Sequence, residues 1–267
     1  MGAGTMHAMI ATEGHDRAAR PGLFLSLEGV DGAGKSGHIQ ALSDAFSKAG
    51  RAVVLTREPG GTALAEELRS MILTRAMDPL TEALLCFAAR RDHIQTVIAP
   101  ALAAGKVVIC DRFTDSTFAY QGGGRGFDLA TLSALESMVQ GADMLTAAQR
   151  EPRTGPLGGL LEPDLTLLFY LAPAIAAERL AGARAPDKFE RQPVDFFDAV
   201  NAGYLARFRE EPSRFALLDA SLTREEVWQG LEATLISRGL LPGYAHLRAH
   251  PRPGARLGLL QNLQERR

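Results

Sequence analysis

A single stretch near the start of the chain, residues 23–36, constrains the fold more than any other. It begins with an apolar run that predicts a buried strand, and it continues into the pattern G-x-x-x-x-G-K-[ST] without a mismatch. The matching residues are Gly29, Val30, Asp31, Gly32, Ala33, Gly34, Lys35 and Ser36. Glycines let the backbone bend so that successive N–H groups face an anion, and a helix predicted over 34–48 adds its N-terminal amides. The stretch therefore predicts a phosphate-binding loop.

The two polar residues that end this loop have separate expected roles. Lys35 is expected to reach the β- and γ-phosphates of a nucleotide such as ATP, and the Ser36 hydroxyl is expected to bind Mg²⁺. The alternative is a glycine-rich turn that matches the pattern by chance. The predicted strand before the loop and the predicted helix after it favour phosphate binding.

Length and composition bound the other possibilities. The 267 residues suit one sizeable domain, or two, and the net charge of −2 indicates no general affinity for nucleic acid. Cys86 and Cys110 lie in apolar surroundings and are expected to be buried thiols in a reducing compartment. No apolar run approaches the roughly 18 residues of a membrane helix. We therefore expect a cytoplasmic protein with no membrane association.

The rest of the chain alternates short apolar runs with helical patterns. Strands are predicted at 52–56, 107–111, 164–171 and 215–219, and helices at 63–74 (capped by Thr62), 80–104, 116–120, 129–140, 173–180, 194–210 and 223–237, with a loop at 121–126. Continuous apolar strands separated by helices are typical of a parallel sheet covered on both faces. The prediction is a three-layer α/β/α fold of the P-loop NTPase type, with a five-stranded parallel sheet and a helical lid.

Four segments fall outside the predicted core of this single domain, which covers 23–239. Residues 1–22 are expected to be a flexible leader, and residues 240–267 an irregular tail. Residues 142–163 are longer than a usual connection and are expected to form a mobile insert. The polar segment 181–193 is the candidate lid.

Arginines gather at the predicted carboxyl ends of the strands, where parallel sheets bind ligands. They are Arg57, Arg90, Arg91, Arg112 and Arg125. A single arginine of this kind is most simply a solvated surface residue. Several at one edge of a sheet instead suit the recognition of phosphate groups, which arginine contacts through two donors at once.

Taken together, these motifs resemble the bacterial thymidylate kinases from Leu23 to about Arg238. The resemblance is carried by EGVDGAGKS in the phosphate loop, TREPGGT at 56–62, the FAAR region, DRF at 111–113, YQGGGRG at 120–126 and PDLTLLFYL at 163–171. It implies a kinase that transfers the γ-phosphoryl group of Mg-ATP to dTMP, forms dTDP and acts as a homodimer packed through helices. The predicted helix 80–104 is the candidate for the dimer face.

The resemblance also assigns roles around the acceptor. It implies that Asp31 accepts a hydrogen bond from the 3′-hydroxyl group, that Arg57 and Arg112 hold the dTMP phosphate, and that Glu58 orders the acceptor and metal region. Tyr120 would exclude a 2′-hydroxyl group. The catalytic set that it implies is Lys35, Arg184, Asp31 and Arg112.

Further implied roles concern the base, the metal and the lid. Ser116 would lie near the thymine, Arg90 beside the ring and Gln121 at its edge. Asp111 would hold Mg²⁺ through water, or would instead pair with a nearby arginine. Because Asp31 stands where some relatives carry a cation, a lid residue would contact the γ-phosphate. Arg184 is the first candidate, followed by Lys188 and Arg191.

Three departures from the family pattern leave questions open. Gly37 stands where a second hydroxyl residue usually follows the loop, and glycine weakens a helix by up to about 1 kcal/mol relative to alanine. The aromatic residue that stacks on thymine is replaced by Cys86 if the alignment is anchored on Arg90, and Phe87 is its neighbouring substitute. Lys188 replaces an arginine in the lid pattern.

Two rival functions remain compatible with the sequence. The first is a related kinase with a shifted acceptor, such as dUMP or another deoxynucleoside monophosphate, and Cys86 motivates it. The second is a nucleotide-binding paralogue without turnover, and Gly37 together with the unusual C-terminus motivates it. An intact Lys35 and Ser36 argue against the second.

Overall fold

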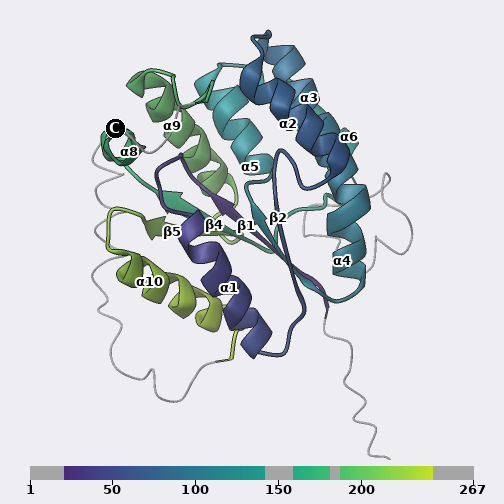
Figure 1. Ribbon diagram of the computed structural model, residues 1–267, viewed down its shortest axis with the longest axis vertical. Helices are drawn as coiled ribbons and strands as arrows, with labels where there is room; N and C mark the ends of the chain where they lie inside the picture. Colours follow the sequence, from purple (N-terminus) through teal and green to yellow (C-terminus); the bar gives the residue numbers. More distant parts are fainter. Residues whose placement is uncertain (1–20, 142–158, 181–186, 243–267) are drawn as a thin grey trace, which may run out of the picture.

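One parallel sheet forms the centre of the structure, a computed structural model that describes residues 21–141, 159–180 and 187–242. Its five strands are all parallel and lie in the order β2-β3-β1-β4-β5. Helices cover both faces of the sheet (Figure 1). The predicted three-layer α/β/α fold with a five-stranded parallel sheet is confirmed.

The strand register brings the phosphate loop, Arg57 and Asp111 to one edge of the sheet. The strands are β1 Leu23–Glu28, β2 Val53–Arg57, β3 Val107–Asp111, β4 Leu165–Tyr170 and β5 Phe215–Asp219. Asp111, the last residue of β3, pairs with Leu27 on one side and with Arg57 on the other. The phosphate loop after β1 therefore begins beside the ends of β2 and β3, as expected at the carboxyl edge of a parallel sheet.

The helices follow the predicted pattern closely in most places. They are α1 Ser36–Lys48, α2 Ala63–Thr74, α3 Pro79–His93, α4 Ala99–Ala103, α5 Thr114–Thr117, α6 Leu129–Gln140, α8 Pro173–Leu180, α9 Val194–Glu210 and α10 Arg224–Ser237, with π-helical segments η1 Ile94–Ile98 and η2 Phe118–Gly124. The cap predicted at Thr62 is present, because Thr62 accepts a hydrogen bond from the Ala65 N–H group. At the start of α10, Thr223 forms a capping box with Glu226.

Two predicted elements are wrong in their hydrogen bonding. The expected single helix over 80–104 is divided into α3, η1 and α4. Pro100, the second residue of α4, has no N–H group to donate, so the helical hydrogen bonds change register just before it. Of the expected loop over 121–126, residues 121–124 instead form the second half of η2. A Cβ atom on Gly123 would lie 2.5 Å from the Ala199 carbonyl oxygen, so this glycine permits close packing of α9.

Most of the predicted leader, insert and tail lies outside the described residues. At the described end of the insert, Leu161 is buried and pairs with the end of α6. Its N–H group donates to the Gln140 carbonyl oxygen at 2.8 Å, and the Gln140 side chain donates to the Leu161 carbonyl oxygen at 3.0 Å. Residues 159–163 are therefore tied to the domain.

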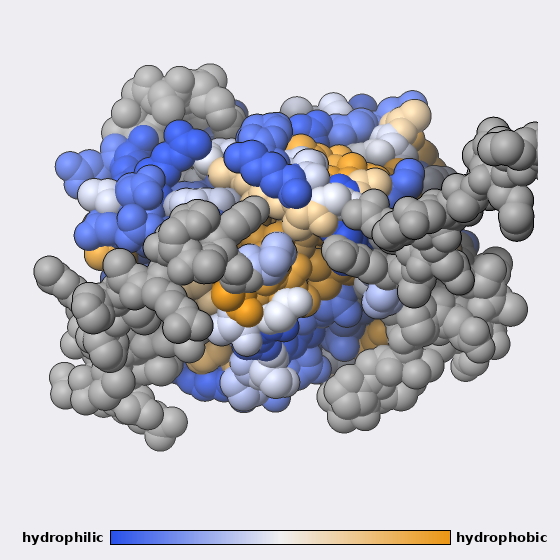
Figure 2. Space-filling model, turned by 90° about the horizontal axis from the view of Figure 1, so that it is seen from below, coloured by the Kyte–Doolittle hydropathy of each residue, from blue (hydrophilic) through white to orange (hydrophobic). Residues whose placement is uncertain are grey.

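Apolar side chains fill the spaces between the sheet and both helical layers. One core cluster joins the sheet to α1, α9 and α10, and a second joins it to α3, α4 and α6. On the face shown in Figure 2, a hydrophobic area at the centre is flanked by hydrophilic residues. Within the described ranges, no helix combines the length and the apolar character that a membrane crossing requires.

Gly37, in the first turn of α1, offers a direct test of this local packing. A Cβ atom there would meet Arg224 Nε at 3.6 Å, which is ordinary contact. We expect Gly37→Ala to raise the free energy of unfolding by about 0.5–1 kcal/mol, because alanine restricts the unfolded chain and suits a helix. Urea unfolding of the variant and the unchanged protein measures this difference.

Gly29→Ala is the matched control. Gly29 has a φ of 132°, and a Cβ atom there would lie 2.3 Å from the Phe169 carbonyl oxygen. The same substitution should therefore destabilise the protein at this position. A loss of stability in Gly37→Ala would contradict the packing described for α1.

Candidate active site

The phosphate loop connects β1 to α1 in a conformation that depends on its glycines. Gly29, Gly32 and Gly34 have φ values of 132°, 82° and 82°, which other residues rarely adopt. The Lys35 ammonium group folds back over the loop and donates to the carbonyl oxygens of Gly29 at 2.8 Å and Val30 at 3.0 Å. The loop and its lysine therefore form a compact cationic cradle at the N-terminus of α1.

Lys35 is buried close to the positive charge of Arg112. Burial, together with the nearby Arg112 charge, lowers the pKa of Lys35 to about 8, even though Asp31 and Asp111 act in the opposite direction. Polyanionic phosphate groups placed in the loop would offset both causes. The electrostatics of the loop therefore favour a bound anion.

Asp111 offers an unused acceptor beside this cradle. Its Oδ1 atom is buried and has no hydrogen-bond partner in the described structure. Asp111 lines the same cavity as Lys35 and Ser36. A carboxylate oxygen and a serine hydroxyl are ligands that Mg²⁺ accepts, since this ion keeps several waters and uses few protein ligands. These residues fit a Mg²⁺ site shared with phosphate oxygens.

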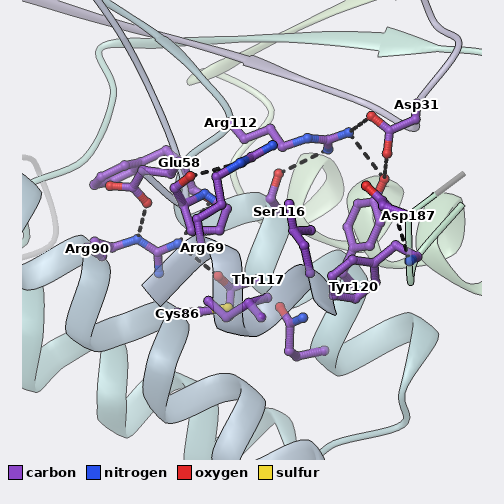
Figure 3. A pocket seen from close by; sticks show the side chains of 16 residues that line it. Asp31, Glu58, Arg69, Cys86, Arg90, Arg112, Ser116, Thr117, Tyr120 and Asp187 are labelled. Carbon is purple, nitrogen blue, oxygen red and sulfur yellow. Dashed lines mark hydrogen bonds and ion pairs between the residues drawn. The ribbon is translucent and has the colours of Figure 1, made fainter. Parts of the chain in front are cut away.

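Arg112, the residue after β3, contacts the phosphate loop, α5 and α9. Its guanidinium group donates to Asp31 Oδ1 at 2.7 Å, to the Gly29 carbonyl oxygen at 2.9 Å and to the Tyr204 hydroxyl at 2.9 Å. Weaker contacts run to Ser116 at 3.4 Å and to the Tyr120 hydroxyl at 3.3 Å. Figure 3 shows Arg112 extended across the pocket toward Asp31 and Tyr120.

The Asp31–Arg112 pair is held in its charged form. Burial by itself raises the pKa of Asp31, but the charges of Arg112 and Lys35 outweigh it and lower that pKa to about 2. Burial lowers the pKa of Arg112, but Asp31 and other neighbours raise it well above its usual range. Asp31 is therefore a hydrogen-bond acceptor at neutral pH.

Glu28, which the sequence analysis did not select, supports the residues around Arg112. It accepts hydrogen bonds from the Phe113 N–H group at 2.7 Å, from Ser116 Oγ at 2.5 Å and from the Tyr204 hydroxyl at 3.0 Å. Burial, and then the nearby Asp115 charge, raises the pKa of Glu28 to about 7. Its place between an apolar strand and a glycine loop was the signal that could have identified it.

The far end of the pocket is organised by Arg90 on α3. Its Nε atom donates to Glu58 Oε2 at 2.7 Å, and its Nη2 atom donates to Thr117 Oγ1 at 2.8 Å. Glu58 is also 2.9 Å from His93 Nδ1. Arg90 Nη1 is buried and lacks a hydrogen-bond partner among the described residues. One donor of Arg90 is therefore available to a ligand.

Cys86 and Phe87 are separated by the helical twist of α3. Cys86 lines the pocket, whereas Phe87 is absent from the described residues that line it and packs in the core under the Arg90 guanidinium group at 4.9 Å. Burial raises the pKa of the Cys86 thiol to about 12, so it is an apolar wall and not a nucleophile. The aromatic residues at the pocket are Phe113, Tyr120 and Phe189.

Three arginines, Arg57, Arg69 and Arg112, line the cavity at the phosphate loop. Arg57 is exposed and pairs with Glu66 at 2.8 Å. Arg69, which the sequence analysis missed, donates to the Pro59 carbonyl oxygen at 2.9 Å. Burial, and then repulsion from Arg57, lowers the pKa of Arg69, and Arg112 adds to this effect. The charges of Arg57, Arg69 and Arg112 therefore face one region, and an anion bound there would reduce their mutual repulsion.

The three lid residues expected to contact the γ-phosphate differ in what the structure shows of them. Arg184 lies outside the described residues. Lys188 pairs with Glu82 at 2.6 Å and donates to the Arg75 carbonyl oxygen at 3.1 Å, so it is directed at α3 and the end of α2. The Arg191 N–H group donates to the Asp187 carbonyl oxygen at 3.2 Å, in a turn near residue 190.

Two cavities meet at this site. The cavity at the phosphate loop has a volume of about 590 Å³, and the cavity that reaches Arg90 and Gln121 has a volume of about 710 Å³. The two cavities share Asp31, Glu58, Arg69 and Arg112 as lining residues. Two ligands bound in them would therefore meet at Asp31 and Arg112.

Comparison with known proteins gives one consistent family. Residues 27–230, which contain the residues that line both cavities, match the family described as thymidylate kinase. The chain is 60% identical over 220 residues to the thymidylate kinase of Albidiferax ferrireducens, covering 82% of this chain and 98% of that protein. It is 57% identical over 222 residues to that of a Polaromonas species, covering 82% and 99%. A crystal structure of thymidylate kinase from Ehrlichia chaffeensis is similar with a TM-score of 0.59 and 28% identity, over 81% of this chain and 99% of that one.

The raised pKa of Glu28 predicts a pH dependence of stability that Glu28→Gln removes. At pH values between 4.5, the ordinary pKa of this group, and about 7, the folded protein binds the proton of the Glu28 carboxyl group more tightly than the unfolded chain does. The contribution of Glu28 to stability is therefore complete below pH 4.5 and is lost as the pH rises through about 7. We expect the stability of the unchanged protein relative to Glu28→Gln to fall by roughly 1–3 kcal/mol across this window in urea unfolding. A flat difference would show that Glu28 titrates alike in both states.

Proposed function

Because the chain belongs to the thymidylate kinase family, we propose that it transfers the γ-phosphoryl group of ATP to dTMP and forms dTDP. The observation that carries this proposal is the meeting of the two cavities at Asp31 and Arg112. Phosphoryl transfer depends mainly on holding donor and acceptor in line and on stabilising negative charge. A phosphate loop that opens onto an arginine-lined second cavity meets both needs.

The donor triphosphate is assigned to the phosphate loop. The backbone N–H groups of residues 29–36 and the ammonium group of Lys35 would hold its β- and γ-phosphates. Ser36 and the unpartnered Oδ1 atom of Asp111 would hold Mg²⁺ together with water. When bound, Mg²⁺ neutralises charge on the phosphate oxygens and helps to orient them.

The acceptor phosphate is assigned to the three arginines, Arg57, Arg69 and Arg112. Their mutual repulsion is relieved when a dianionic phosphate lies among them, and each guanidinium group can donate two hydrogen bonds. Glu58, held by Arg90 and His93, orders the turn beside them.

The sugar is assigned to the part of the pocket beside Asp31. Because Asp31 stays ionised, it would accept a hydrogen bond from the 3′-hydroxyl group. The Tyr120 ring would occupy the space that a 2′-hydroxyl group needs. Ser116 lines the same region and helps to hold Arg112.

The base is assigned to the end formed by Arg90, Gln121 and Cys86. Thymine presents a carbonyl oxygen beside an N–H group. The unpartnered Nη1 donor of Arg90 suits the carbonyl oxygen, and the amide oxygen of Gln121 suits the N–H group. Phe87 is left out of this assignment because it packs in the core.

Three finer features complete the proposal. Arg184 is assigned to the γ-phosphate, since Lys188 is engaged by Glu82.

Exposed apolar residues on α2, α3 and α6 suit the face of a homodimer. They are Leu64, Met71, Leu80, Leu84, Leu129 and Met138. A solution mass of 28.6 kDa in light scattering, which is the mass of one chain, would contradict the dimer.

The free, buried cysteines suit the reducing environment of the cytoplasm, and cell fractionation tests this location.

A panel of acceptors tests the function. The purified protein is supplied with Mg-ATP and one nucleoside monophosphate at a time, including dTMP, dUMP and dCMP, and ADP formation is followed. We expect turnover of about 1–100 per second with dTMP, which is the ordinary range of kinases, and loss of turnover when Mg²⁺ is removed with EDTA.

The other outcomes of the panel identify the rivals. Comparable rates with dUMP would indicate a kinase with a shifted acceptor preference, which the small Cys86 side chain in the pocket lining permits. Binding of ATP and dTMP without turnover would indicate a paralogue that has lost catalysis.

A further inference from the structure

A buried carboxylate, Glu82 on α3, lies beside the base end of the pocket and is contacted by three donors, two from η2 and its C-terminal cap and one from the segment at residue 188. Gln121 Nε2 donates to its Oε1 atom at 2.9 Å, and Arg125 Nε lies 3.3 Å from the same atom. Lys188 Nζ lies 2.6 Å from its Oε2 atom. The Glu82 side chain is 1% exposed. Such a carboxylate is stable only with partners of this kind.

The charge of this cluster fixes the orientation of an amide. A carboxylate only accepts hydrogen bonds, so it must face the NH₂ end of Gln121 and not the carbonyl end. Within the described structure, Glu82 is the hydrogen-bond partner of the Gln121 side chain. Gln121 also lines the pocket, which leaves its Oε1 atom as the polar group that a ligand can contact.

We propose that Glu82 is a positioning residue that sets base specificity by holding the Gln121 carbonyl oxygen toward the ligand. The inference rests on the proposed function, because it assumes that a nucleobase fills this end of the pocket. An amide that is free to turn presents either a donor or an acceptor, and it therefore discriminates poorly. An amide fixed by Glu82 presents an acceptor.

The fixed amide distinguishes two pyrimidines by their N3 position. Thymine carries a hydrogen on N3 and donates to the Gln121 oxygen, whereas cytosine has a lone pair there and repels it. The Arg90 Nη1 donor discriminates in the same direction, since thymine has a carbonyl oxygen at C4 and cytosine has an amino group. A site whose buried polar groups are left unpaired by the wrong ligand rejects that ligand strongly.

Glu82→Gln tests the inference because a neutral amide can face either end of Gln121. Calorimetric titration with dTMP and with dCMP gives the ratio of their Kd values, and ADP formation gives kcat and KM for dTMP. We expect the preference for dTMP to fall at least about tenfold, through weaker dTMP binding and a raised KM, with kcat changed by less than about threefold.

Lys188→Met is the matched control, because it removes one partner of Glu82 and leaves the Glu82–Gln121 contact. If Glu82 only anchors the segment of Lys188, both variants should alter kcat alike and leave the preference for dTMP unchanged, which would overturn the inference. Under our account, the preference in Lys188→Met stays within about threefold of the unchanged protein, because Arg125 still accompanies Glu82.

A double-mutant cycle with Gln121→Met isolates the pairwise effect. Once the amide is gone, Glu82→Gln should cause no further loss of base preference, and an additive loss would contradict the coupling. If Glu82→Gln fails to fold in thermal unfolding, Glu82→Asp, which shortens the carboxylate by one methylene, carries the same expectation. The Kd ratio is measured without turnover, so a protein that binds dTMP selectively but does not phosphorylate it would refute the proposed function and leave this inference readable.

Discussion

The ion pair between Asp31 and Arg112, at 2.7 Å, joins the parts of the structure on which the site depends. Asp31 belongs to the phosphate loop, and Arg112 follows β3 with a φ of 71°, a conformation that is uncommon outside glycine. From there Arg112 reaches Tyr204 on α9 and Ser116 on α5. One side chain thus ties the phosphate loop to α5, which lines the second cavity, and to α9, and Glu28 on β1 contacts both of these partners.

The electrostatics of the site favour bound phosphate groups. Lys35 and Arg69 both have lowered pKa values, caused by burial and by neighbouring positive charges. Such an arrangement costs stability in the protein alone and becomes favourable when anions enter. The same reasoning applies at the base end, where the buried Nη1 donor of Arg90 lacks a partner among the described residues. The protein therefore holds its binding groups in place before the ligands arrive, which limits the reorganisation needed during transfer.

Local patterns predicted the fold and the phosphate loop, because apolar strands, glycines and helix caps act over a few residues. Residues that act through packing between distant segments were not predictable in this way. The fold places Arg69 at the pocket, and it places Glu82 and Tyr204 against Gln121 and Arg112, which line the pocket. The π-helical segments were missed because apolar periodicity does not distinguish their hydrogen bonding from that of an α-helix. The choice between Cys86 and Phe87 likewise needed the rotation of α3, which directs Cys86 to the cavity and Phe87 to the core.

The most direct test of this account is the affinity of the Arg112→Lys variant for dTMP, measured by calorimetric titration. Lysine keeps the positive charge but lacks the planar fork that contacts Asp31 and that, in the proposed function, also holds the acceptor phosphate. We expect the Kd for dTMP to rise at least about tenfold, while the affinity for Mg-ATP changes by less than about threefold. A Kd for dTMP within about twofold of the unchanged protein, in a variant that folds normally, would contradict the central place given to Arg112.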